Sequence, residues 1–129
     1  EFEALGTRDP SPFVAIATAV DFLNNIGIEA ISARGFQLAG YLRQKIKDEF
    51  SGAELWTSTD RNLSGSLTAF LPDGIDGVTL SAELKQRYQI QVVSYSLGGN
   101  PAHVRVSTHF YNTFEELDTL ITAIKDISG

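Results

Sequence analysis

The sequence contains no cysteine, and this absence excludes several kinds of chemistry. Without a thiol the chain has no disulfide framework, no thiolate nucleophile and no cysteine-ligated metal site. Positive charge is also scarce, because 10 lysines and arginines are outnumbered by 16 aspartates and glutamates, which leaves a formal net charge of −6. Binding to nucleic acid needs clustered lysine and arginine, so we expect no nucleic-acid partner.

Long apolar runs are missing as well. No stretch approaches the roughly 20 apolar residues that a membrane-spanning helix needs, and no charged and then apolar leader opens the sequence. We therefore expect no membrane partner and a cytoplasmic location. The opening residues Glu1–Leu5 lack a methionine, which favours an excised piece of a longer protein.

The apolar residues that are present suffice for one core. With 129 residues, of which 43% are hydrophobic, the chain fits a single domain over residues 1–129. A first helix is predicted to begin with Ser11 as N-cap and Pro12 at the first helical position. It runs to about Asn25, and Gly27 suits a left-handed end. Its apolar residues recur at three and four positions, so we expect a wide face that packs against another element.

A second long helix is predicted from Glu29 to about Phe50, with basic residues on its exposed side. These basic residues are Arg34, Arg43, Lys45 and Lys47. Beyond it, alternating or β-rich stretches predict strands near residues 54–57, 66–71, 90–97 and 103–110, with a short helix over 79–88. The order predicts an α+β fold, in which a small, mainly antiparallel sheet of three or four strands is covered on one face by helices.

The last strand alternates two kinds of side chain. Val104 and Val106 are expected to face the core, which places His103, Arg105 and His109 on the wetter face. The two histidines are six residues apart, roughly 20 Å along a strand, so we expect no metal site.

The C-terminal helix has a strong start signal. Thr113 is the predicted N-cap, and Glu116 three residues later completes a capping box. The predicted buried stripe consists of Leu117, Leu120, Ile121, Ile124 and Ile127.

The run from Val104 to Leu120, VRVSTHFYNTFEELDTL, resembles the C-terminal signature of class V aminotransferases. These are fold-type-I pyridoxal phosphate (PLP) enzymes, and they include cysteine desulfurases and isopenicillin N epimerase-like proteins. The resemblance implies the small C-terminal domain of a longer enzyme, with a large PLP-binding domain in the same chain, an amino-acid substrate and a homodimer. The extended form of the segment after Gly6 is closer to the epimerase-like branch, and the lack of cysteine argues against a persulfide mechanism.

The resemblance gives Arg105 a role. In the family, the arginine at this place holds the carboxylate of the substrate, and a guanidinium fork matches a carboxylate with two hydrogen bonds. From the residues alone, an arginine on a solvated strand face that pairs with a nearby acid is the favoured interpretation.

Gly6 and Thr7 are the second pair that the resemblance singles out. In the family, a Gly-Thr pair reaches across the dimer, and its threonine contacts the phosphate of the PLP bound to the other subunit. From the residues alone, Thr7 is a turn residue before a helix.

The sequence lacks the cofactor lysine of the family. Pyridoxal chemistry needs a lysine for the Schiff base, and the lysines of this chain lie on predicted helix surfaces. We therefore expect the isolated chain to neither bind PLP nor turn over substrate. The alternative hypothesis is an α+β ligand-binding or interaction module without catalysis.

Overall fold

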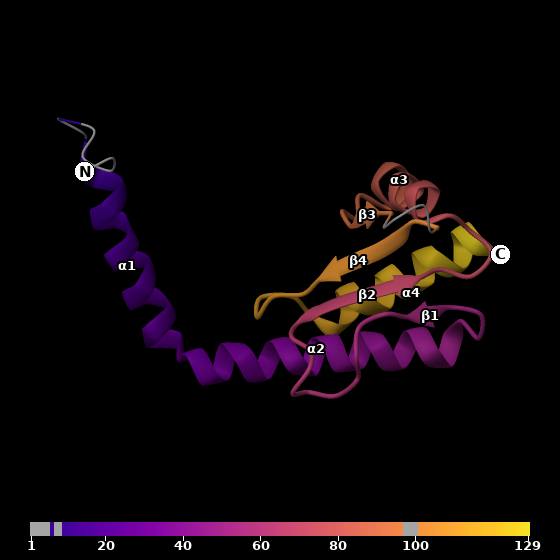
Figure 1. The fold of residues 1–129 in the computed structure, drawn as a ribbon, viewed down its shortest axis with the longest axis horizontal. Coiled ribbons are helices and arrows are strands. Elements are labelled where there is room, and N and C mark those ends of the chain that lie inside the picture. The colour runs from indigo at the N-terminus through magenta and orange to yellow at the C-terminus, as the bar shows by residue number, and fades with distance from the viewer. Residues whose placement is uncertain (1–5, 7–8, 97–100) are drawn as a thin grey trace.

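The computed structural model describes residues 6, 9–96 and 101–129 (Figure 1). The elements in chain order are α1 (Ser11–Ile26), α2 (Ile28–Glu49), β1 (Glu54–Leu55), β2 (Leu67–Leu71), α3 (Gly77–Tyr88), β3 (Val93–Tyr95), β4 (His103–Ser107) and α4 (Phe114–Ser128). The four strands form one sheet in the order β1-β2-β4-β3, and every neighbouring pair is antiparallel. The predicted α+β fold is confirmed.

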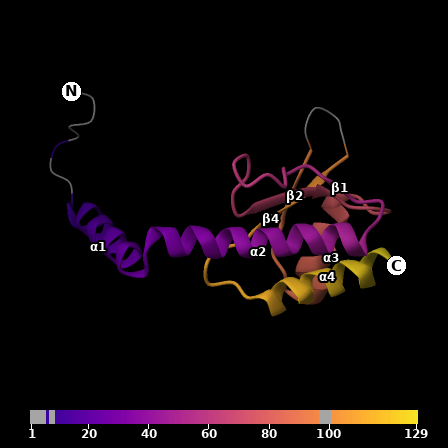
Figure 2. The same cartoon turned by 90° about the horizontal axis from the view of Figure 1, so that it is seen from below.

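Helices cover only one face of the sheet. Helices α2 and α4 run along that face (Figure 2), and α3 packs on β3, β4 and α4. The side chains of Phe70, Val104 and Val106 point into this layer and join the core. Most of the remaining core comes from the helices, with Leu38, Leu42, Ile46, Leu80, Leu84, Leu117, Leu120, Ile121, Ala123 and Ile124. In the described part of the chain, no helix lies on the opposite face of the sheet, which we call the open face.

Helix α1 stands apart from this body (Figure 1). None of its residues is buried, although Phe13, Val14, Ile16 and Phe22 are large and apolar. Gly27 ends the helix at the predicted position, but its φ of +96° and ψ of 119° differ from the left-handed helical end that was expected. Helix α2 continues at an angle of 71°. The predicted packing face of α1 is therefore present, but no described residue covers it.

The start of α1 differs from the prediction by one residue. Pro10 occupies the N-cap position, and Ser11 is the first helical residue. The Ser11 N–H and hydroxyl both donate to the Asp9 carboxylate, at 2.9 and 2.6 Å. Asp9 therefore accepts from a free N–H group at the start of the helix, as an N-cap side chain would. No single helix in the described ranges is long and apolar enough to cross a bilayer; α1 and α2 pass that test only as a bent pair.

The predicted exposure of Arg43 is wrong. Arg43 projects from α2 under the sheet, and only 5% of it is exposed. Its guanidinium donates to the Thr68 and Ser64 hydroxyls at 3.3 and 3.0 Å, and to the carbonyls of Gly65 and Leu67 at 2.7 and 2.9 Å. Helical periodicity could not reveal this position, because the acceptors belong to the loop before β2 and to β2 itself.

The strand-to-helix unit at the C-terminal end follows the prediction closely. Thr113 caps α4 by accepting from the Glu116 N–H at 3.2 Å, and the Glu116 carboxylate accepts from the Thr113 N–H at 3.0 Å. Strand β4 ends at Ser107, earlier than predicted, because the His109 N–H donates to the Asn112 side chain and starts a turn.

Gly77 provides a stability prediction. It begins α3 against the start of β4, and a Cβ added there would lie 2.3 Å from the Ala102 carbonyl oxygen. Alanine favours a helix by about 1 kcal/mol more than glycine does. The added Cβ would overlap backbone atoms, however, and these can move aside only by distorting β4. We expect Gly77→Ala to lower the free energy of unfolding by about 1–3 kcal/mol in urea titrations.

Gly40 supplies the matched control. It lies in the interior of α2, and a Cβ added there would meet nothing within 4 Å. Gly40→Ala should therefore raise the free energy of unfolding by about 0.5–1 kcal/mol. Equal effects of the two substitutions would contradict the close approach of α3 to β4.

Ion pairs join α2 to α4 and predict acid sensitivity. The Tyr41 hydroxyl donates to Asp118 at 2.7 Å and holds the pKa of that carboxyl below its ordinary value of 3.8. Lys125 bonds Glu49 at 2.6 Å and holds the pKa of Glu49 below 4.5. Each carboxyl has a lower pKa folded than unfolded, so its stabilising contribution is present above the ordinary pKa and is lost as pH falls through the folded pKa.

We therefore expect the thermal unfolding midpoint to be constant near neutral pH and to decrease once the pH is below about 4.5. Calorimetry between pH 7 and pH 3 measures this directly. Asp118→Asn should make the decrease of the midpoint at acid pH (the acid limb of the curve) smaller. Asp21→Asn, on the uncovered α1, should leave this decrease unchanged. An identical acid limb in the Asp118 variant would show that the α2–α4 contacts do not cause it.

Candidate functional site

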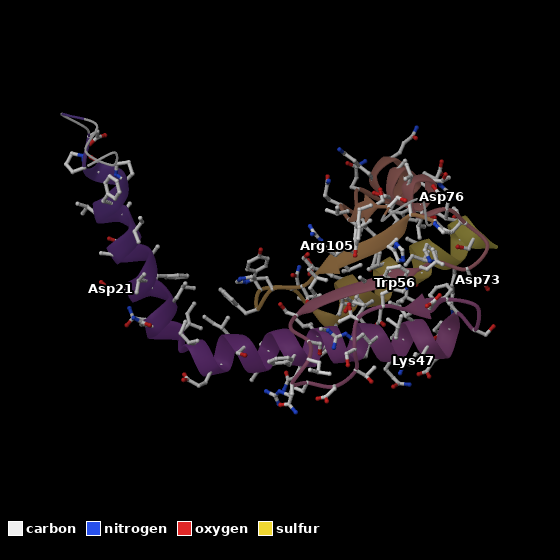
Figure 3. All side chains as sticks on the ribbon, in the orientation of Figure 1. Asp21, Lys47, Trp56, Asp73, Asp76 and Arg105 are labelled. Carbon is white, nitrogen blue, oxygen red and sulfur yellow. The ribbon has the colours of Figure 1, made fainter. Side chains whose placement is uncertain are left out.

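Arg105 lies near the centre of the open face. Strand β4 is an interior strand, and Arg105 pairs with Ala69 of β2 on one side and Val93 of β3 on the other. Its neighbours Val104 and Val106 are buried against the helices, so strand alternation turns Arg105 to the other face. The predicted orientation is confirmed, and Figure 3 shows Arg105 away from the helix layer.

Arg105 has no acidic partner in the described part of the chain. No carboxylate there lies within 4.0 Å of its guanidinium, and its Nε is buried without a hydrogen-bond partner. The chain satisfies other arginines well: Arg43 makes four hydrogen bonds, and Arg34 donates to the Asn112 carbonyl at 3.1 Å. The interpretation of Arg105 as a surface arginine paired with a nearby acid therefore fails for the residues described.

An aromatic group lies beside Arg105. His103 precedes it by two residues on the same face and is fully buried, although no helix covers it. The ring centroid of Trp56 lies 3.4 Å from that of His103, and the Tyr95 ring lies 5.8 Å away on the other side. Neither ring nitrogen of His103 has a partner among the described residues. Arginine and aromatic rings thus share one open surface.

Sequence reasoning did not single out Trp56. In the structure Leu55 is partly buried against the core, and alternation turns Trp56 to the open face. Strand β1 has only two residues, so this alternation was too short to identify from the sequence.

Gly6 lies away from this surface. Thr7 is outside the described residues. Gly6 is exposed, with a φ of +76° that suits the predicted turn. Helix α1 has 16 residues, about 24 Å at 1.5 Å per residue, and it separates Gly6 from the body of the fold (Figure 1). The structure therefore does not bring Gly6 together with Arg105.

The four lysines do not fit a PLP site. Lys45 pairs with Asp118 at 3.3 Å, and Lys125 pairs with Glu49, both between α2 and α4. Lys47 and Lys85 are exposed on α2 and α3. None projects from the open face beside Arg105, because all four lie on helices of the other face. The described residues also hold no group of three or more metal-ligating side chains.

We compared the sequence with known protein families and with characterised proteins. The sequence model of the aminotransferase class-V family matches residues 1–120. Isopenicillin N epimerase of Amycolatopsis lactamdurans is 38% identical over 127 residues, and that of Streptomyces clavuligerus is 34% identical over 128. Both matches cover 98% of this chain, but only 31% and 32% of the relatives' length.

Solved structures agree on the fold. A cysteine desulfurase of Thermococcus onnurineus NA1 superposes with a TM-score of 0.84 at 18% identity, over 95% of this chain and 32% of that one. A cysteine desulfurase of Escherichia coli gives 0.80 at 21% identity, over 94% and 31%. Because the family model matches residues 1–120, the chain belongs to the class V aminotransferase family.

Proposed function

We propose that this chain is the C-terminal, substrate-binding domain of a PLP-dependent class V enzyme of the isopenicillin N epimerase type. The single observation that carries the proposal is Arg105, half-buried on the open face and without an acidic partner in the described residues. A partly buried guanidinium without an acidic partner among the described residues is suited to bind a carboxylate by two parallel hydrogen bonds. The α-carboxylate of an amino acid is the ligand that the family supplies.

The two isopenicillin N epimerases support the epimerase branch. They are 38% and 34% identical to this chain, whereas the cysteine desulfurases range from 27% in Xylella fastidiosa to 33% in Haloferax volcanii. The chain has no cysteine to accept sulfur. In this proposal Arg105 anchors and orients the substrate, and the groups that act on its α-carbon belong to a part of the protein outside this chain.

The uncovered helix α1 fits the same proposal. Its apolar side chains are exposed along the whole helix; Phe13 is 64% and Phe22 is 59% exposed. A patch of this kind marks an interface. We expect α1 to pack on the large domain of the same chain and to hold Gly6 at a distance from Arg105. That distance is compatible with the second role, in which Thr7 contacts the PLP phosphate of the other subunit of a homodimer.

The test is an absorbance spectrum with PLP. We expect the 129-residue chain to give the spectrum of free PLP, because its lysines are on helix surfaces. A longer protein that includes the large domain should show the shifted band of protein-bound PLP. Lys85→Ala in the longer protein is the control and should keep the band. If the longer protein also gives only free PLP, the proposal fails and a non-catalytic module becomes the better hypothesis.

A further inference from the structure

The surface around Arg105 carries information about the ligand beyond its carboxylate. Exposed apolar side chains share the open face with Arg105: Trp56 and Val93 are each 42% exposed, and Leu67 is 38% exposed. Val93 pairs directly with Arg105, and Leu67 pairs with Ser107, two residues further along the same strand. One cation on a surface of apolar side chains is complementary to a ligand that carries both a carboxylate and an apolar group.

Acidic groups do not alter this picture. Glu54 also turns to the open face by alternation with Leu55, but it lies on β1, two strands away from β4. At about 4.8 Å per strand this places it roughly 10 Å to the side, so it does not neutralise Arg105. It does mark an edge of the apolar surface.

Trp56 is held in place from beneath. Its indole lies on the buried imidazole of His103, which in turn stacks on Tyr95 with the ring planes 29° apart. Aromatic rings packed in this way gain energy beyond their buried area and fix the orientation of the outermost ring. We define the aromatic shelf as Trp56, His103 and Tyr95.

The shelf contains an uncompensated polar group. Both ring nitrogens of His103 are buried and lack partners among the described residues. A buried group without a hydrogen bond costs about 1–3 kcal/mol, so stability alone would favour an apolar ring at this position. This cost is a second observation, independent of Arg105, that the packing of the described residues alone does not explain.

We propose that the aromatic shelf binds the side chain of the amino acid whose carboxylate Arg105 holds, and that it selects large apolar or aromatic side chains over small ones. This inference depends on the proposed function, since Arg105 supplies the anchor. His103 and Arg105 are two residues apart on one strand face, about 7 Å at 3.4 Å per residue. From this backbone spacing we expect a ligand on the guanidinium to reach the shelf with a side chain of several carbon atoms.

The experiment compares two ligands that share the α-amino and carboxylate groups. Binding of L-phenylalanine and L-alanine to the full-length protein is measured by titration calorimetry in the parent and in Trp56→Ala. We expect L-phenylalanine to bind about tenfold more weakly to the variant, because stacking area is lost, and L-alanine to bind equally. Trp56→Phe should keep most of the preference. Leu63→Ala, at a 75% exposed residue in the turn before β2, is the control and should change neither ligand.

Two further variants make the outcomes distinct. Trp56→Leu keeps His103 covered, so it tests the shelf even if Trp56→Ala fails to fold, and it should reduce the phenylalanine preference about threefold. His103→Phe should raise the thermal midpoint, because it removes two unpartnered nitrogens. Equal weakening of both ligands, or no weakening, in the Trp56 variants overturns the shelf. Arg105→Ala distinguishes the proposals: if it leaves both ligands unchanged, the proposed function itself fails.

Discussion

Replacing Arg105 with alanine in the full-length protein is expected to raise the dissociation constant and KM for the amino-acid substrate by roughly 30-fold to several thousand-fold. This corresponds to about 2–5 kcal/mol, the usual loss when one partner of a buried charge pair is removed. The reason is the absence of any other described cation near the site: the remaining arginines of the body are engaged elsewhere, as Arg43 is with four acceptors. Steady-state kinetics with a calorimetric titration measures the effect.

Arg105→Lys refines this prediction. Lysine keeps the charge but loses the planar fork, so we expect an intermediate loss of affinity. Arg61→Ala is the matched control, because the Arg61 guanidinium carbon lies 4.6 Å from the centroid of the Phe36 ring, which belongs to α2. An unchanged KM and kcat in Arg105→Ala would remove the carboxylate role from this residue.

Local patterns in the sequence predicted most of the fold. The Thr113 and Glu116 capping box identified the start of α4, and Gly27 identified the end of α1, because both signals act within a few residues. Alternation along β4 also predicted the side to which Arg105 points. These features depend on backbone geometry that neighbouring residues determine.

Features that depend on distant residues could not be predicted in the same way. The acceptors of Arg43 lie 21 to 25 residues further along the chain, so only the folded arrangement shows that this arginine is buried. Trp56 comes to the open face through a strand of two residues, and its partner His103 belongs to a strand much later in the sequence. The proposed carboxylate role of Arg105 came from the family resemblance, and the structure adds that no described carboxylate pairs with it.

Arg43→Met provides the second large effect, this time on stability. The substitution leaves the Gly65 and Leu67 carbonyls and two hydroxyls without their donor. Some of these groups can turn toward water or toward each other, so we expect a loss of about 2–4 kcal/mol in the free energy of unfolding rather than the sum of four bonds. Urea unfolding of the 129-residue chain measures it, provided that the m-value is unchanged.

Lys47→Met on the same helix is the matched control, since Lys47 is exposed and should change stability by less than about 0.5 kcal/mol. The two arginines then separate two kinds of role. Arg43→Met should lower stability and leave ligand affinity of the folded protein close to its original value, because Arg43 points into the helix layer. Arg105→Ala should do the reverse, since removing an unpartnered buried Nε costs the fold little. If both substitutions lowered stability equally, Arg105 would be a structural residue, and the open face would lose the group on which its ligand depends.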